Sequence, residues 1–285
     1  MLIDTHAHLN FNAYKNDAKE VIKRALENKI WMINVGSQYT TSKRTLSIAK
    51  EYPKGVFAAV GLHPIHLNTG IFKVKIDKEE VEFETREESF AYQKYKELAK
   101  DPKVVAIGEI GLDYYYKPKT KKKLSLFKEK QREVLREQIK LAQERGLPVI
   151  FHCRMAHKDL IEELKKIKGT IRGVIHCFTG DWEEAKSYLE MGFYLGFNGI
   201  IFKLKNLKDI IKKAPLERII LETDCPYLTP PPKEGRNEPL FVKYIGKRIA
   251  EIKNLSFEKM SEITTKNAQK LFKIPPPCGG EGKTS

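Results

Sequence analysis

The sequence is poor in cysteine and has no long apolar run, and both absences narrow the class of protein. Four cysteines in 285 residues, none in a CxxC spacing, do not make a disulfide scaffold and favour a reduced, cytoplasmic protein. No apolar run approaches the roughly 20 residues of a transmembrane helix, and no basic segment followed by an apolar one opens the chain. We therefore expect neither a membrane span nor a secretory leader, and no obligate protein partner is evident.

Charge is unevenly divided between the two signs. The chain has 52 basic and 37 acidic residues, a formal net charge of +15. This excess indicates an anionic partner such as nucleic acid, but lysine-rich surfaces are also common in proteins from hot environments. Composition alone leaves both interpretations open.

Short apolar runs alternate with longer amphipathic stretches along most of the chain. One such stretch, residues 125–146, has apolar residues at helical spacing and ends at Gly146. Strands that are apolar throughout are typical of buried parallel sheets. The length of the chain favours a closed (β/α)8 TIM-type barrel over an open sheet. No G-x-G-x-x-G motif follows the first run, and its absence argues against a dinucleotide-binding (Rossmann) fold. The eight runs are residues 2–9, 30–37, 55–64, 104–113, 147–154, 173–180, 193–200 and 218–226.

Two segments depart from this alternation. Residues 70–88 begin with alternating apolar and charged side chains, which predicts a small exposed hairpin inserted on the top face of the barrel. Residues 274–285 are rich in Pro, Gly and polar residues, which predicts a disordered tail. We therefore expect a single domain over residues 1–273.

Polar side chains that can bind metal stand at the ends of five apolar runs. The carboxyl ends of parallel barrel strands share one face, so these side chains can converge there. A single histidine at a strand end is more often a hydrogen-bonded structural residue, but six such residues buried without a cation would leave unpaired charge. The pattern predicts a site for two divalent ions with water completing the shells. The six are His6, His8, Glu109, His152, His176 and Asp224.

Cys153, Cys177 and Cys225 each directly follow one of these residues. Strand alternation would point their side chains to the opposite side, toward the helices, as packing residues. The predicted ligands are then nitrogen and oxygen only, which permits zinc, manganese or magnesium.

The chain resembles the TatD family of metal-dependent deoxyribonucleases, within the amidohydrolase-like metallohydrolase barrels. The matching motifs run in order from residue 4 to 239: DTHAHLN, VGLHP, GEIGLDYY, FHCR followed by Met155 and Ala156, HCFTG, ETDCPYLTP and GRNEP. The resemblance implies a TIM-type barrel, two divalent metal ions, and hydrolysis of DNA phosphodiester bonds by metal-activated water.

The resemblance also implies roles for individual residues. His6 and His8 would hold one ion with Asp224, and His152 and His176 would hold the second. Glu109 would bridge or contact both ions. Asp224 would accept the proton of the attacking water, so Asp224 and Glu109 are the predicted catalytic residues.

Further positions have two possible roles each. Glu222 could orient a ligand histidine or fill a polar barrel layer, and Arg154 could bind a substrate phosphate or form a rim salt bridge. His63 could contact the substrate or support a metal ligand from behind. Tyr114, Tyr115 and Tyr116 could stack on bases, although we expect at least one of them to pack in the core, and Arg236, in GRNEP, is a candidate phosphate contact.

Five of the six lysines between residues 117 and 128 could contact phosphates, or could belong to a solvated loop. The five are Lys117, Lys119, Lys121, Lys122 and Lys123. We expect a deoxyribonuclease that acts as an exonuclease on single strands or ends of DNA. The first alternative is a metallohydrolase of the same barrel that acts on a small-molecule ester, amide or phosphotriester. The second is a nucleic-acid-binding or scaffold protein with a structural metal, although structural zinc sites usually close four ligands around each ion.

Overall fold

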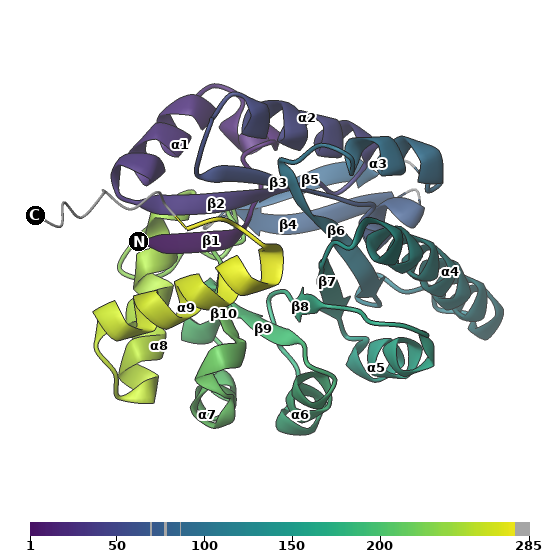
Figure 1. The fold of residues 1–285 in the computed structure, drawn as a ribbon. Coiled ribbons are helices and arrows are strands. Elements are labelled where there is room, and N and C mark those ends of the chain that lie inside the picture. The colour runs from purple at the N-terminus through teal and green to yellow at the C-terminus, as the bar shows by residue number, and fades with distance from the viewer. Residues whose placement is uncertain (69, 77–78, 86, 277–285) are drawn as a thin grey trace, which may run out of the picture.

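In the computed structural model, eight parallel strands form one sheet that curves into a barrel (Figure 1). The structure describes residues 1–276 apart from 69, 77, 78 and 86, and side chains outside 69–86. The eight strands coincide with the eight apolar runs, so the predicted TIM-type barrel is confirmed. In sheet order they are β1 (Leu2–Ala7), β2 (Ile30–Val35), β3 (Val56–Val60), β6 (Val104–Asp113), β7 (Val149–Arg154), β8 (Gly173–Ile175), β9 (Tyr194–Phe197) and β10 (Ile219–Leu221).

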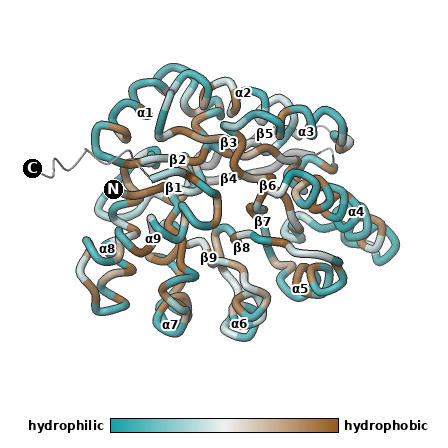
Figure 2. The backbone as a smooth tube through the Cα atoms, viewed as in Figure 1, coloured by the Kyte–Doolittle hydropathy of each residue, from teal (hydrophilic) through white to brown (hydrophobic). Residues whose placement is uncertain are grey.

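Helices surround the barrel, with hydrophilic surfaces outward and apolar strands inside the ring (Figure 2). The predicted helix over residues 125–146 corresponds to α4, which begins four residues earlier than predicted. The helix ends where Gly146 adopts the left-handed conformation. No helix in the described part of the chain combines the length and apolar character that crossing a bilayer requires. The helices are α1 (Ala18–Glu27), α2 (Tyr39–Lys50), α3 (Tyr92–Leu98), α4 (Lys121–Arg145), α5 (His157–Lys166), α6 (Trp182–Glu190), α7 (Leu207–Lys213), α8 (Val242–Lys253) and α9 (Phe257–Phe272).

The barrel closes between its first and last strands at their carboxyl ends. The backbone N–H of Asp224 donates to the carbonyl of His6 at 2.8 Å, and the N–H of His8 donates to the carbonyl of Cys225 at 2.9 Å. This closure brings residues 217 and 218 positions apart in sequence side by side at one mouth of the barrel.

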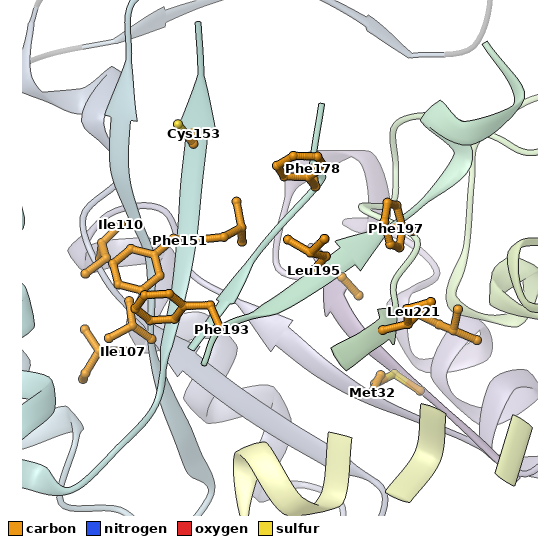
Figure 3. Packing of buried hydrophobic residues seen from close by; sticks show 14 of the residues in the cluster. Met32, Ile107, Ile110, Phe151, Cys153, Phe178, Phe193, Leu195, Phe197 and Leu221 are labelled. Carbon is orange, nitrogen blue, oxygen red and sulfur yellow. The ribbon is translucent and has the colours of Figure 1, made fainter. Parts of the chain in front are cut away.

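Buried apolar side chains form two layers, one on each face of the strands. The inner layer includes Ile3, Ile33 and Ile150, and Leu271 and Phe272 of α9 pack against it. The outer layer lies between strands and helices, where the rings of Phe151 and Phe193 meet edge to face at 5.5 Å (Figure 3). The alternation of side chains along each strand therefore serves two cores.

The predicted insertion contains an antiparallel hairpin, β4 (Gly70–Ile76) with β5 (Glu79–Thr85). It follows β3 and a short 3-10 helix, η2 (Pro64–Leu67), and so leaves the barrel on the side of the carboxyl strand ends. Of the predicted disordered tail, residues 277–285 lie outside the described residues. The first residue of that tail, Ile274, is buried in the inner layer. The single-domain boundary itself stays a prediction.

A candidate metal centre at the mouth of the barrel

The six predicted metal ligands meet at the carboxyl ends of their strands. Glu109 lies at the centre of the group: its carboxylate oxygens are 3.5 Å from Nε2 of His6, 2.8 Å from Nδ1 of His152 and 3.5 Å from Nε2 of His176. The Asp224 carboxylate lies 3.5 Å from Nε2 of His8 and 3.8 Å from Nε2 of His6. All six side chains are largely buried.

Local backbone geometry aims these side chains inward. His6 and His8 share one face of β1 near its end, and their Nε2 atoms are 3.1 Å apart. Asp224 follows β10 in the left-handed conformation, with φ of 57°, which ends the strand alternation. Gly111 lets β6 approach β7 closely, because a Cβ there would lie 1.9 Å from the carbonyl oxygen of His152.

In three of the four histidines, the ring nitrogen that faces away from the centre contacts an oxygen. Nδ1 of His8 lies 3.0 Å from the carbonyl of Val35, and Nε2 of His152 lies 3.2 Å from Oδ2 of Asp113. Nδ1 of His176 lies 2.9 Å from Oε1 of Glu222. Such outer contacts fix the orientation of metal-binding imidazoles.

Glu222 is fully buried and occupies a position built around it. Its Oε1 accepts a hydrogen bond from the backbone N–H of Cys177 at 2.6 Å. Gly196 provides the space, since a Cβ at that position would lie 2.5 Å from Oε2 of Glu222. Of the two roles considered from the sequence, the contact with His176 favours the one in which Glu222 orients a ligand.

Dense negative charge in this buried space holds protons on two histidines. Burial opposes protonation of His176, but the carboxylates of Glu222, Asp224 and Glu109 outweigh it and raise its pKa to about 10. Burial likewise opposes protonation of His152, while Asp113 and Glu109 raise its pKa to about 9. Burial also opposes ionisation of Glu109, yet the surrounding imidazoles keep its pKa well below the ordinary value.

This donor set fits divalent metal ions. His6, His8 and Glu109 offer three ligand atoms within 4.8 Å of one another, and so do Glu109, His152 and His176. Imidazole and carboxylate together suit zinc and manganese, and charge that is now balanced by protons can be balanced by a cation. These two groups share Glu109, and the number of ions that they hold stays a prediction.

Two further residues, Asp113 and His63, lie beside the six. Asp113, four residues after Glu109 on β6, reaches His152, and the sequence interpretation missed it. His63 follows β3, and its Nε2 lies 3.7 Å from Oε1 of Glu109. Its Nδ1 accepts a hydrogen bond from the backbone N–H of Ile65 at 3.0 Å, so the neutral ring carries its proton on Nε2, facing the centre. Burial lowers the pKa of His63 to about 3, which makes it a neutral hydrogen-bond donor.

The other predicted substrate contacts, Tyr114, Arg236 and Arg154, have different surroundings. Tyr114 is only 4% exposed, so its ring packs in the core and cannot stack on a base. Arg236 forms an ion pair with Asp17 and lies over the ring of Tyr14, which engages its guanidinium away from the six ligands. Arg154 lies at the exposed end of β7 and stacks on Tyr115, with no carboxylate partner among the described side chains.

Two of the three cysteines pack as predicted, and the third does not. Cys153 and Cys225 are buried in the outer apolar layer, and Figure 3 shows Cys153 among those side chains. Cys177 has φ of 45°, which breaks the strand alternation. Its sulfur lies within 4.8 Å of ligand atoms of His176 and Asp224, so the expectation that Cys177 points to the helices was wrong.

Comparisons with known proteins agree with this architecture. A metal-dependent hydrolase of Bacillus subtilis named YabD, itself uncharacterized, is 42% identical over 96% of this chain and 100% of its own length. A protein of Edwardsiella piscicida named 3'-5' ssDNA/RNA exonuclease TatD is 31% identical, covering 96% of this chain and 100% of its own. The crystal structure of the TatD homologue YJJV of Escherichia coli K12 superposes with a TM-score of 0.81 at 27% identity, over 96% and 98% of the two chains.

The family described as TatD related DNase matches residues 3–273. This chain is therefore a member of the TatD related DNase family of metal-dependent hydrolases.

Proposed function

We propose that the protein hydrolyses phosphodiester bonds in DNA with two divalent metal ions, as an exonuclease acting on single strands or ends. The observation that supports this most is the position of Glu109, whose two carboxylate oxygens lie between histidines of β1, β7 and β8. A carboxylate shared between two groups of histidines would suit a pair of divalent ions, which would together stabilise the attacking and leaving oxygens. The relative named as an ssDNA/RNA exonuclease, together with the net charge of +15, supports a nucleic-acid substrate.

Each residue has a defined task in this proposal. His6, His8 and Asp224 would hold one ion, and His152 and His176 the other, with Glu109 between them. When bound, the ions would lower the pKa of a water molecule and stabilise negative charge on the phosphoryl oxygens. Asp224 would accept the proton of the attacking water while the new phosphorus–oxygen bond forms and the bond to the leaving oxygen breaks. His63 would donate a hydrogen bond from Nε2 to a phosphate oxygen.

Hydrolysis of a labelled single-stranded oligonucleotide by the metal-stripped protein tests the proposal. Magnesium, manganese and zinc are added back separately, and the product ladder gives the direction of cleavage. We expect metal-dependent cleavage that Glu109→Gln and Asp224→Asn each abolish without unfolding. A parallel RNA oligonucleotide tells whether the enzyme prefers DNA.

The control for an inert protein is the number of ions that it binds. A protein that binds two ions but cleaves no oligonucleotide with any metal would contradict nuclease activity. That outcome would favour a small-molecule ester, amide or phosphotriester on the same site. Retained cleavage in both Glu109→Gln and Asp224→Asn would contradict the assigned site.

A further inference from the structure

Four large apolar side chains are exposed among those that the structure describes. Tyr115 is 49% exposed, Tyr116 37%, Leu126 64% and Met155 65%, and among the described side chains these are the large apolar ones that remain exposed. They come from the segment that joins β6 to α4, the start of α4, and the residue after β7. Tyr115, Tyr116, Arg154 and Met155 lie at or just beyond the ends of the neighbouring strands β6 and β7, and we call these four residues the rim patch.

The centre of the rim patch is a stacked pair. The guanidinium carbon of Arg154 lies 3.6 Å from the centroid of the Tyr115 ring, and the ring of Tyr116 meets Tyr115 edge-on at 4.7 Å. A stacked guanidinium keeps its N–H groups free at its edge, and none of the described carboxylates pairs with Arg154. The pair therefore offers a flat face and unused donors at the same point.

The stacked pair is joined directly to the metal centre. Arg154 is two residues beyond His152 on β7, and Asp113 and Arg154 are partners in the β6–β7 register. The backbone N–H of Tyr115 donates to Oδ1 of Asp113 at 2.9 Å, while Oδ2 of Asp113 contacts His152. Two strand residues span about 7 Å, so the pair stands one layer above the ligands, on the solvent side.

Five lysines continue the surface from the aromatic residues into α4. Their side chains are exposed, and none forms an ion pair with a described carboxylate, unlike many lysines elsewhere in the chain. The first turn of α4 contains three of them and no acidic residue, which places positive charge where the helix dipole disfavours it. Breaking a local rule in this way is typical of functional surfaces. The five are Lys117, Lys119, Lys121, Lys122 and Lys123.

We propose that the rim patch is the platform on which bases of a single-stranded nucleic acid stack as the strand enters the metal centre, with its phosphates along the five lysines. Aromatic faces beside a cationic track are the means by which proteins bind single strands without reading sequence. The occupant is a single strand, because a base must be unpaired to lie on the Tyr115–Arg154 pair. This inference rests on the proposed function and adds the surface that selects the substrate.

Two substrates of different size separate the rim patch from the metal centre. A single-stranded oligodeoxynucleotide reaches both, whereas bis(4-nitrophenyl) phosphate reaches only the metal centre. We expect Tyr115→Ala and Arg154→Ala each to raise KM for the oligonucleotide about tenfold, the loss of one stacked base. Hydrolysis of the small diester should change less than twofold. Tyr115→Phe keeps the ring face and should behave as the unmodified protein.

The lysines are tested by salt dependence. Changing all five to Gln should flatten the fall of oligonucleotide kcat/KM with rising salt, because fewer counterions are released. The control variant changes five exposed lysines that are distant from the carboxyl strand ends, and it should keep the original slope. These controls are Lys165, Lys168, Lys212, Lys270 and Lys273.

A binding measurement tests the rim patch independently of nuclease activity. Fluorescence anisotropy of a labelled oligodeoxynucleotide, measured in the full chain carrying Glu109→Gln, reports the rim patch whether or not the protein is a nuclease. Weaker binding on adding Tyr115→Ala supports the platform even if no phosphodiester is cleaved. Unchanged binding together with unchanged KM would overturn the proposed platform. Equal losses of activity on both substrates would also overturn it, because Tyr115 would then act only by positioning Asp113.

Discussion

Oδ2 of Asp113 lies 3.2 Å from Nε2 of His152, while Nδ1 of the same ring lies 2.8 Å from Glu109. The imidazole is therefore held between two carboxylates, one in the centre and one behind it. With Nε2 protonated toward Asp113, Nδ1 is the nitrogen left to bind a metal. The carboxylate behind the ring also makes Nδ1 a more basic ligand.

Replacing Asp113 with Asn should therefore weaken metal binding without unfolding the protein. Loss of a carboxylate behind a ligand histidine typically costs about 10–100-fold in metal affinity or activity. Competition with a chelator measures the affinity, and circular dichroism monitors the fold. Asp101→Asn is a matched control, because Asp101 also accepts the backbone N–H two residues later, that of Lys103, but contacts no histidine. Equal affinities in the two variants would contradict a positioning role for Asp113.

The stability of the metal-stripped protein should fall as pH rises from about 6.5 to 10. The pKa values of His152 and His176 are raised to about 9 and about 10, whereas an unfolded histidine titrates near 6.5. Within that window the folded state binds more protons than the unfolded state, so the stabilisation is complete below pH 6.5 and lost as pH rises through 9 and 10. Chemical denaturation of stripped protein across the window measures it.

Metal binding should have the opposite dependence on pH. Both imidazoles must lose a proton to bind a metal ion, so apparent affinity should rise with pH and binding should release protons. Titration calorimetry in buffers of different ionisation enthalpy counts them. Glu222→Gln removes a carboxylate that favours the His176 proton and should reduce the release. Release that is the same in this variant would contradict the assigned cause.

The barrel and the convergence of the six polar side chains at its mouth were predictable because they depend on short-range pattern. Each strand is a continuous apolar run, and a polar residue at its end stands out, as His152 does after four apolar residues. Asp113 was missed although the same signal was present, because Glu109 already accounted for an acidic residue in that run.

Residues beyond strand ends were placed less well, because alternation stops where the backbone turns. Of the three tyrosines considered for base stacking, Tyr114 is buried and Tyr115 and Tyr116 are exposed, a difference that the sequence did not specify. The side chain of Cys177 does not follow the strand alternation because its φ is positive, and no residue in the HCFTG motif signals such a conformation at that position. The engagement of Arg236 with Asp17 depends on a contact across 219 residues, which no local pattern contains.

The three described cysteines should differ in their effect on the metal centre. Cys153→Ala and Cys225→Ala should leave metal content intact, because both sulfurs are buried in the apolar layer. The proposed nitrogen and oxygen ligands also predict that cobalt-substituted protein lacks a thiolate-to-metal charge-transfer band. Cys177 is the sensitive position, because its sulfur lies near His176 and Asp224. A band that disappears in Cys177→Ala would show that sulfur is a ligand.

Helix α9 should stabilise the barrel without contributing to its chemistry. Its buried Phe272 packs against the inner layer, and Asn267 donates to the carbonyl of Ile219, where β10 begins, so α9 covers the end opposite the metal centre. Phe272→Ala should lower the free energy of unfolding by about 3–5 kcal/mol, the usual cost of removing a buried phenylalanine ring. Lys270→Ala, at an exposed position of the same helix, should change it by less than about 0.5 kcal/mol. Denaturant unfolding measures both, and kcat of the folded Phe272→Ala protein should match that of the unmodified chain. A large loss of kcat with little change in stability would mean instead that the two ends of the barrel are coupled.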